Sequence, residues 1–272
     1  MTELLHETVA FLQGRGFVNP EFGIISGTGL GNLFPEHIQE KQEIPYAHIP
    51  HFPVSTVESH HGNLQYGDVH GRKVLSMQGR LHYYEGYSMQ QITFPVRVMK
   101  MLGIKYLLIS NAAGNLNPHW ETGELMLLDD HINLLPDNPL RGKNYDVLGP
   151  RFPDMSQPYS KLLQDKLLMI AAGKKIKLHK GVYAAVSGPN LETRAEYRFL
   201  QKIGCDAVGM STVPEVIVAN HMNLPCCAIS ALTDDCNPDN LQEISLAEIV
   251  QAARHAEPLL TELYIELIRI LD

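Results

Sequence analysis

Apolar residues recur along the chain in two alternating patterns. Short continuous apolar runs are typical of buried strands, and apolar residues at intervals of about three to four are typical of amphipathic helices. The short runs predict strands at 22–26, 73–77, 106–110, 125–128, 182–186, 207–211 and 226–231. The helical spacing predicts helices at 2–13, 90–102, 159–172 and 194–203, and two more beginning near 214 and 245. This alternation predicts an α/β fold, one domain over residues 1–272, with a parallel or mixed sheet covered by helices.

Glycine and proline mark the boundaries of these elements. Gly14, Gly173 and Gly204 follow predicted helices and are expected to end them. The strand at 125–128 is expected to end at Asp129, Asp130 and His131. Residues 136–158 are rich in both residue types and predict a long irregular loop, of a kind that is usually functional or disordered.

Composition and charge narrow the classes of function. The 272 residues are 44% hydrophobic and 19% charged, which is ordinary for a globular protein with a substantial core. The formal net charge of −8 argues against nucleic acid or an anionic membrane as a partner, so any anion site must be a local pocket of positive potential. The four cysteines include no CxxC pair, no signal peptide is evident, and no apolar run approaches about 20 residues. We therefore expect a soluble cytoplasmic protein with free thiols.

The stretch 77–87 holds the first candidate for chemistry. Arg80 and His82 follow a predicted strand, and residues two apart in an extended backbone project from the same face. A guanidinium and an imidazole aimed at one spot suit an anion such as phosphate. In the alternative interpretation Arg80 pairs with Glu85 and the histidine lies exposed on a loop, and this stretch alone does not decide between the two.

A glycine-rich turn at 27–31 directly follows the first predicted strand. Such a turn lets backbone N–H groups approach an anion. It also permits a dinucleotide site and hence an oxidoreductase, but the third glycine of that fingerprint falls on Asn32 and no acidic strand end follows. The anion interpretation is therefore the stronger one. Small residues at 112–114 follow another predicted strand, at the sheet edge where α/β proteins usually bind ligands.

Four histidines gather between 44 and 67, which raises the question of a metal site. Their spacing matches no familiar zinc pattern, and we expect His48, His51 and His61 to be loop residues. His60 precedes a glycine in a probable turn and stays a site candidate.

Taken together, the motifs resemble the trimeric purine nucleoside phosphorylases. The resemblance runs in order from about residue 20 to the C-terminal helix and rests on the segments 27–31, 77–87, 110–114, 188–193 and 208–216. It implies a single α/β domain around a mixed, distorted barrel-like sheet, assembled as a homotrimer. It also implies a pentosyltransferase of purine salvage, in which phosphate cleaves a purine nucleoside to the free purine and α-ribose 1-phosphate. Phosphate would be the co-substrate, with no metal and no other cofactor.

The resemblance also implies roles for individual residues. The residues expected to bind phosphate are Thr28, His60, Arg80, His82, the backbone of Ala112, and Ser211. Those expected to bind the ribose are Tyr84, Met210 and, from a neighbouring subunit, Phe152. Those expected around the purine are Ala113, Leu191, Glu192, Val208, Gly209 and Asp234. His82, Glu192 and Asp234 are the residues expected to act in catalysis.

Two positions depart from this family's usual pattern. Asp234 stands where members that prefer 6-oxopurines have Asn, and Leu246 stands where they have a His for the sugar 5′-hydroxyl. Both are similar to the related 5′-methylthioadenosine phosphorylases. Glu192 argues the other way, because its carboxylate accepts from the N1–H of hypoxanthine or guanine.

The sequence therefore predicts an enzyme for inosine and guanosine. A methylthioadenosine or broad-specificity phosphorylase is the alternative, and a non-enzymatic purine- or phosphate-binding protein is a weaker one. We further hypothesise that a proton held on Asp234 lets it donate to the purine N7.

Overall fold

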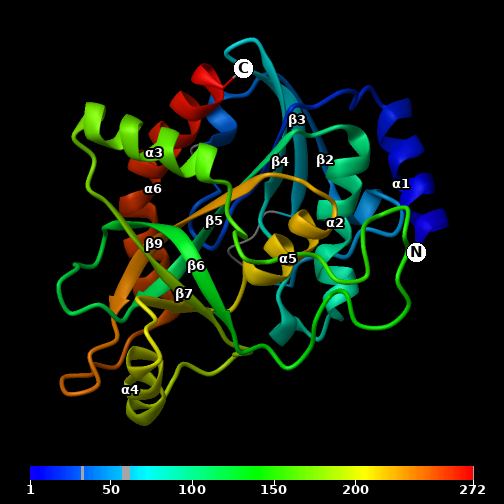
Figure 1. Ribbon diagram of the computed structural model, residues 1–272. Helices are drawn as coiled ribbons and strands as arrows, with labels where there is room; N and C mark the ends of the chain where they lie inside the picture. The colour runs from blue at the N-terminus through cyan, green and yellow to red at the C-terminus, as the bar shows by residue number, and fades with distance from the viewer. Residues whose placement is uncertain (32–33, 57–61, 272) are drawn as a thin grey trace.

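The computed structural model describes residues 1–31, 34–56 and 62–271. Within these ranges nine strands form one sheet in the order β2-β3-β4-β1-β5-β8-β7-β6-β9 (Figure 1). The strands are β1 (Phe22–Ile25), β2 (Gln39–Pro45), β3 (Asn63–Val69), β4 (Arg72–Gln78), β5 (Tyr106–Asn115), β6 (Leu125–Asn133), β7 (Leu178–Ala185), β8 (Ala207–Gly209) and β9 (Cys226–Asp235).

One half of the sheet closes on itself. Strand β5 pairs antiparallel with β8 and parallel with β9, and β6 pairs with both β7 and β9. Because β7 also pairs with β8, the five strands β5, β8, β7, β6 and β9 form a closed barrel with mixed strand directions. This confirms the mixed, distorted barrel-like α/β sheet. The other four strands extend the sheet from β5 through its parallel pairing with β1.

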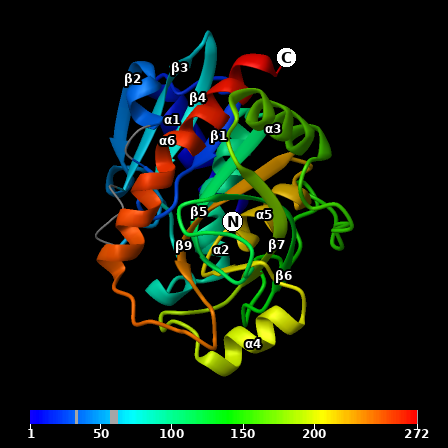
Figure 2. The ribbon, with the colours of Figure 1, turned by 90° about the vertical axis from the view of Figure 1, so that its left-hand side faces the viewer.

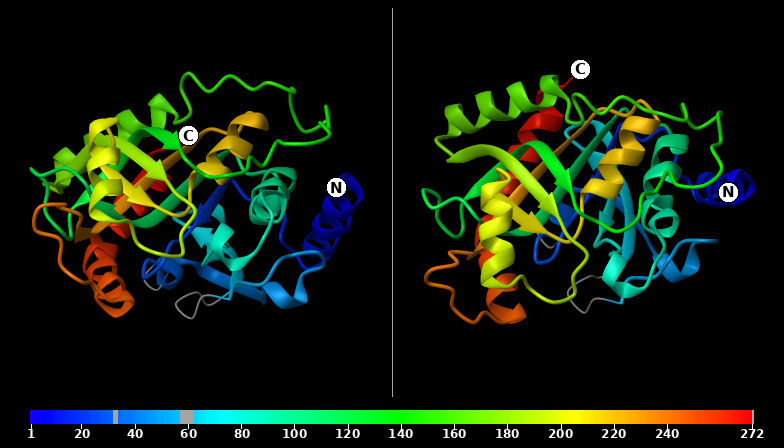
Figure 3. Two further views of the ribbon diagram at one scale, coloured as in Figure 1. Left: turned by 90° about the horizontal axis from the view of Figure 1, so that it is seen from below. Right: turned by 60° about the horizontal axis from the view of Figure 1, so that its bottom comes forward.

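Helices cover the sheet in two groups. They are α1 (Thr2–Gly14), α2 (Met89–Leu102), α3 (Lys161–Lys174), α4 (Arg194–Lys202), α5 (Val213–His221) and α6 (Leu246–Ile270). Helices α1, α2 and α5 share one apolar core with the sheet, and α3 and α6 share a second core on its other side (Figure 3). Figure 2 shows α6 as the long helix that crosses one face of the molecule, with α3 beside its C-terminal part.

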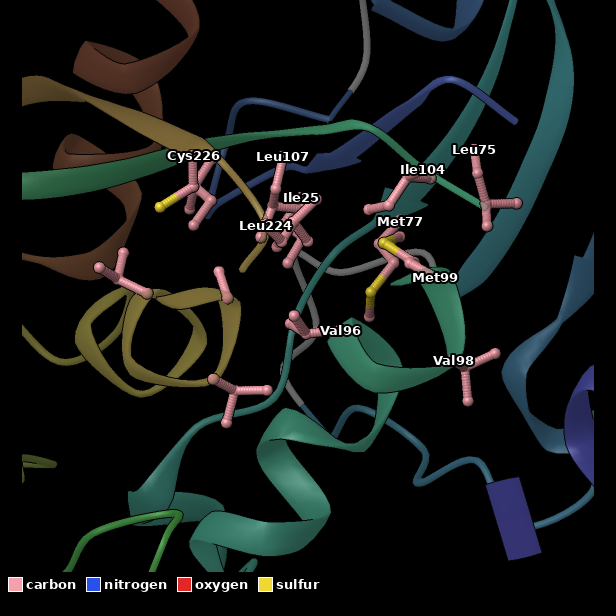
Figure 4. Packing of buried hydrophobic residues seen from close by; sticks show 14 of the residues in the cluster. Ile25, Leu75, Met77, Val96, Val98, Met99, Ile104, Leu107, Leu224 and Cys226 are labelled. Carbon is pink, nitrogen blue, oxygen red and sulfur yellow. The ribbon is translucent and has the colours of Figure 1, made fainter. Parts of the chain in front are cut away.

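The first core joins strands to helices through small and medium apolar side chains. Figure 4 shows Ile25 of β1 and Met77 of β4 close to Val96 and Met99 of α2. The side chains of Ile25, Val96 and Met99 are at most 1% exposed. Pro95 lies inside α2. In the described part of the chain, no helix is both long enough and apolar enough to cross a membrane.

Several predicted boundaries were wrong, and each has a local cause. Strand β6 continues through Asp130 and His131 to Asn133, because its pairing with β7 resumes after an irregularity there. Helix α3 continues through Gly173 and ends at Lys174, with the next residue, Lys175, in the left-handed conformation that usually favours glycine.

The strands β2 and β3 were missed altogether. Six of the seven residues of β2 are exposed, so this edge strand shows no alternation of apolar and polar residues. Strand β3 is largely buried but contains Gln65, Gly67 and Asp68, which break its apolar run. Tertiary pairing with β4, rather than local pattern, makes this segment a strand.

Removal of a central side chain is expected to destabilise the sheet strongly. Leu108 is fully buried in β5, opposite Ile24 of β1 and Cys227 of β9. We expect Leu108→Ala to lower the free energy of unfolding by about 2–5 kcal/mol, measured by urea denaturation, because it leaves a cavity that the sheet cannot close. Leu162→Ala, at a half-exposed side chain on α3, is the control, and a loss below about 1 kcal/mol for Leu108→Ala would contradict its role in the core.

Candidate active site

A cavity of about 400 Å³ opens where several strands end. It is bounded by the glycine-rich turn after β1, the short helix η3 (Tyr83–Glu85) after β4, the second half of β5, and the ends of β8 and β9. The predicted site residues that line it are Thr28, Arg80, His82, Tyr84, Ala112, Ala113, Leu191, Glu192, Val208, Gly209, Met210, Ser211 and Asp234. Segments that lie far apart in the sequence thus contribute to one site.

Two predicted residues are not placed in this cavity. His60 falls outside the described residues. Phe152 lies on the irregular loop between β6 and α3, and its side chain is 87% exposed and does not line the cavity. The loop itself matches the prediction, since 136–158 contains neither helix nor strand.

A buried guanidinium marks one end of the cavity. Arg80 is 1% exposed, and its Nη1 donates to Ser211 Oγ at 2.7 Å and to Thr212 Oγ1 at 3.0 Å. Its Nε lies 3.4 Å from the carboxylate of Glu215, which is also buried. Two hydroxyls and a carboxylate therefore fix this side chain in one orientation, as a preorganised anion site requires.

The backbone beside Arg80 is held in a rare conformation. Thr212 has φ of 72°, in the left-handed region that a β-branched residue adopts at a cost. Its hydroxyl accepts from Arg80 and from Asn111 Nδ2, the latter at 2.9 Å. These contacts offset the strain and bring Ser211, at the junction between β8 and α5, into reach of Arg80.

His82 is buried next to Arg80, so the alternative of an exposed loop histidine is wrong. Its Nδ1 lies 3.0 Å from Glu85 Oε1, and its backbone N–H donates to the same oxygen at 2.7 Å. Glu85 therefore pairs with His82 rather than with Arg80. Burial lowers the pKa of His82, so the ring is neutral at pH 7, and its Nδ1 donates to the carboxylate. Nε2 is then the nitrogen without a proton, which suits it to accept from a phosphate hydroxyl.

The lowered pKa of the Glu85 carboxyl group makes the stability of the folded protein depend on pH in the acid range. Burial would raise its pKa, but hydrogen bonds from His82 and Thr56 outweigh that effect and lower the pKa from 4.5 to about 2. The stabilisation is therefore fully present above pH 4.5 and is lost as the pH falls through about 2. We expect the difference in unfolding free energy between wild type and Glu85→Gln to shrink across this window in urea titrations.

Glu243→Gln, which changes an exposed carboxyl, provides the comparison for that experiment. A difference between wild type and Glu85→Gln that stays constant from pH 4.5 to about 2 would contradict the lowered pKa.

Two carboxyl groups mark the opposite end of the cavity. Glu192 directly precedes Thr193, whose side chain caps α4 by accepting from the backbone N–H of Glu196 at 3.3 Å. This cap sets the direction of the chain and so the position of Glu192. Burial raises the pKa of Glu192, and the nearby charge of Asp234 raises it further.

Asp234 is held by neutral donors. Its Oδ1 accepts from Thr233 Oγ1 at 2.7 Å, and its Oδ2 accepts from Cys236 Sγ at 3.3 Å. The backbone of Gly114 passes close by, since a Cβ there would lie 2.4 Å from Cys236 Sγ and 3.2 Å from Asp234 Oδ2. In this arrangement both carboxylate oxygens act as acceptors and each keeps room for a second donor.

The start of α6 supplies a further wall. Leu246 and Ile249 line the cavity from the first turn of this helix. The helix begins at the predicted capping box, in which Ser245 Oγ accepts from the backbone N–H of Glu248 at 3.3 Å. The cavity therefore has an anion end, an end with two carboxyls, and an apolar wall.

Several lining or supporting residues were missed by the sequence analysis. Glu215 could have been found from the sequence, because an acidic residue inside the apolar run of α5 indicates a buried ion pair. Tyr197 and Cys236 also line the cavity, and no local pattern marks either position. As for a metal, the described residues contain no group of three or more His, Cys, Asp or Glu side chains that could hold one.

Comparisons with known proteins agree with this arrangement. The family model of the phosphorylase superfamily matches residues 21–269. Purine nucleoside phosphorylase 1 of Bacillus subtilis is 49% identical over 234 residues, covering 86% of each chain. The structure of isoform 2 of purine nucleoside phosphorylase from Schistosoma mansoni, in complex with cytosine and ribose-1-phosphate, is 43% identical with a TM-score of 0.94, covering 99% of this chain and 97% of that one. A second S. mansoni phosphorylase structure, in complex with inosine, is 37% identical with a TM-score of 0.93 over 99% and 97% of the two chains. This chain therefore belongs to the phosphorylase superfamily and, within it, to the purine nucleoside phosphorylases, which are pentosyltransferases of the glycosyltransferase class.

Proposed function

We propose that this protein catalyses the phosphorolysis of 6-oxopurine ribonucleosides and deoxyribonucleosides, with inosine and guanosine as substrates. The products are the free purine and α-(deoxy)ribose 1-phosphate, as in purine salvage. The observation that carries the proposal is that one cavity has a buried guanidinium and a neutral imidazole at one end and Glu192 at the other. Such a cavity suits an anion and a purine edge at once. Phosphate is the co-substrate in this scheme, and no other cofactor is needed.

The charges at the two ends explain how the bond between sugar and base would break. The bond from C1′ to N9 of the purine breaks with its electron pair going to the purine, so positive charge develops on the ribose. Phosphate, bound by Arg80, His82, Ser211 and the turn that contains Thr28, stabilises this charge from the α face. A phosphate oxygen then bonds to C1′ with inversion, and the purine anion takes up one proton, which balances the proton that the hydrogen phosphate loses. Preorganised groups at both ends supply most of the stabilisation.

Glu192 supports the preference for 6-oxopurines. Hypoxanthine and guanine carry a hydrogen on N1 that an ionised Glu192 accepts, whereas adenine presents a lone pair there. A mismatched polar pair in a buried site costs about 1–3 kcal/mol. The raised pKa of Glu192 means that this acceptor is fully formed only as the pH rises above that pKa. We therefore expect the ratio of kcat/KM for inosine to kcat/KM for adenosine to increase as the pH rises through the pKa of Glu192.

Asp234 favours a second candidate, the phosphorolysis of 6-aminopurine nucleosides. Thr233 and Cys236 both donate to its carboxyl oxygens, which therefore act as acceptors in this arrangement. As an acceptor, Asp234 suits the N7–H of the departing purine and equally the amino group of adenine. Donation of a proton from Asp234 to the purine N7 stays a prediction.

A direct assay separates the two candidates. Release of free base from inosine, guanosine, adenosine and 5′-methylthioadenosine is measured with and without phosphate. Phosphate-dependent release of hypoxanthine and guanine, with little adenine, supports the main proposal. Preferential release of adenine supports the second candidate. The absence of phosphate-dependent release from all four would contradict both.

The exposed side chain of Phe152, on the loop between β6 and α3, supports a proposal about assembly. We propose that Phe152, which is exposed and does not reach its own cavity, closes the cavity of a neighbouring subunit in a homotrimer. A bare aromatic side chain of this size is typical of interfaces. The four cysteines are free thiols, which fits our proposal of a reducing, cytoplasmic location.

The mass of the wild-type protein tests the trimer, and the activity of Phe152→Ala tests whether this side chain closes a neighbouring cavity. Light scattering should give a mass about three times the 30.4 kDa of the chain for the wild-type protein. The variant should keep its fold but raise KM for nucleoside about tenfold, because the ribose loses its apolar cover. Val147→Ala, at an equally bare apolar side chain on the same loop, is the control. A monomeric wild-type protein with full activity would contradict the proposal.

A further inference from the structure

A small cavity, separate from the candidate active site, lies between α2, the end of α5 and the irregular loop that follows β6. Its volume is about 40 Å³, and its lining includes Gln90 and Arg97 of α2, His221 of α5, and Lys143 and Asn144 of the loop. Among the described residues, none lines both this cavity and the candidate active site. A cavity of this volume has room for about three water-sized groups.

A buried guanidinium faces this cavity. Arg97 is 6% exposed, and its Nη1 donates to Nδ1 of His221 at 3.3 Å. Burial lowers the pKa of His221, so its ring is neutral at pH 7, and the proton on Nε2 lies toward Asn144 Oδ1, 3.4 Å away. His221 therefore accepts a hydrogen bond from Arg97 but offers it no negative charge.

This guanidinium keeps its charge, although no carboxylate neutralises it among the described residues. Burial alone shifts the pKa of Arg97, lowering it from 12.5 to about 10, so the group is protonated at pH 7. Asp137 of the loop pairs with Arg141 instead. Lys143 adds a second positive charge to the lining. Because a buried charge without a counter-charge is costly, this arrangement indicates a site for an anion.

The free part of the guanidinium decides which anion fits. His221 occupies Nη1, whereas Nε and Nη2 of Arg97 have no partner among the described residues. Both atoms are also reached by solvent, because neither is among the sealed polar atoms of the interior. Nε and Nη2 lie side by side, with a spacing that matches the two oxygens of a carboxylate. One carbon and two oxygens fill the space of about three water-sized groups, whereas a nucleoside does not fit.

We propose that this cavity binds a carboxylate group, with Nε and Nη2 of Arg97 as donors and Lys143 as the second cation. The carboxylate belongs either to a small molecule or to an Asp or Glu side chain of a second copy of this chain, since both present the same three atoms. No covalent bond is made or broken. The site lies outside the candidate active site, so the inference goes beyond the proposed phosphorolysis and does not depend on it.

A bound carboxylate would fix the loop to α2. The loop is already held to α5, because Asn144 contacts both His221 and the carbonyl oxygen of Gly149, and a Cβ on Gly149 would overlap the backbone of His221. Lys143 comes from the loop and Arg97 from α2, so an anion between them joins these two segments. The folded protein should therefore be more stable with the carboxylate bound.

Formate, the smallest carboxylate, is the probe. Thermal unfolding of the wild-type protein is followed by circular dichroism while formate replaces chloride at constant ionic strength. We expect Tm to rise by about 2–4 °C once formate reaches about five times its Kd. Arg97→Met keeps most of the side-chain length without the charge and should abolish this rise. Without formate it should be at least as stable as the wild type, because the buried charge is gone, whereas a purely structural Arg97 predicts a loss of stability.

A second variant avoids the core. Lys143 is exposed, so Lys143→Gln should fold normally, and we expect it to raise the Kd for formate about fivefold in titration calorimetry. The matched control is Lys161→Gln, at a lysine of α3 whose side chain is 70% exposed and which does not line this cavity. Its response to formate should equal that of the wild type.

Light scattering and protein concentration distinguish the two sources of the carboxylate. A rise in Tm with formate at every protein concentration, with the mass unchanged, identifies a small molecule. If a second copy supplies the group, Tm of the wild type without formate rises with protein concentration, and Arg97→Met lowers the mass. A wild-type Tm that responds to neither formate nor protein concentration, or the same responses in Arg97→Met, would overturn the inference and leave the proposed function untouched.

Discussion

Arg80→Gln is expected to lower kcat/KM for phosphate by about 10³-fold. The substitution removes the buried positive charge at the anion end, and the neutral amide of glutamine cannot replace two parallel hydrogen bonds from a guanidinium. The effect should appear mainly in the KM for phosphate and in kcat. The KM for nucleoside should change less, because the purine end of the cavity is built from other segments. Steady-state kinetics with each substrate varied in turn measure these effects.

Loss of Arg80 also leaves Glu215 buried without its partner, so a folding defect must be separated from a catalytic one. Arg80→Lys retains the charge and should recover part of the activity, while circular dichroism and urea unfolding report on the fold. Arg141→Gln changes an arginine whose side chain is 76% exposed and should be silent. A folded Arg80→Gln protein with an unchanged KM for phosphate would place the anion elsewhere.

Glu192→Ala is expected to abolish the discrimination between bases. The N1–H of hypoxanthine would lose its acceptor, and we expect kcat/KM for inosine to fall about 100-fold. For adenosine the change should stay within about threefold, because adenine offers no hydrogen at N1. The ratio of the two kcat/KM values, measured at one pH, is the quantity to follow.

Glu243→Ala removes an exposed carboxylate from the segment before α6 and is the matched control, with both kcat/KM values expected to be unchanged. An equal fall for inosine and adenosine in Glu192→Ala would mean that Glu192 supports the cavity instead of distinguishing the bases. In that case Asp234, held by Thr233 and Cys236, would be the group to substitute next.

The sequence predicted best those features that depend on local order. The local pattern left two interpretations of Arg80 and His82 open, and both residues line the cavity, as expected for two side chains on one face of an extended segment. The capping box at Ser245 correctly located the start of α6. A capping box requires only neighbouring residues to agree, so the local pattern was sufficient for it.

Features that depend on distant segments were not predictable in this way. Strand β2 shows no apolar alternation and is a strand because β3 pairs with it, and Glu215 is buried because Arg80 arrives from another part of the chain. The hydrogen bond of Cys236 to Asp234 depends on how tightly β9 passes Gly114. A single sequence shows none of these approaches, since each is set by how separate segments pack together, and the last of them by the closure of the barrel.

That closure has a consequence for how the specificity of such an enzyme can diverge. The groups that we assign to phosphate come mainly from the segments that follow β1, β4 and β8, whereas those that we assign to the base edge and the apolar wall come from the segment before α4, from β9 and from α6. Strand β5 lies between these two sets and pairs with β1, β8 and β9. Substitutions at Asp234 or Leu246 can therefore accumulate in one lineage without disturbing Arg80 and His82. The fold thus allows the choice of nucleoside to evolve separately from the chemistry performed on it.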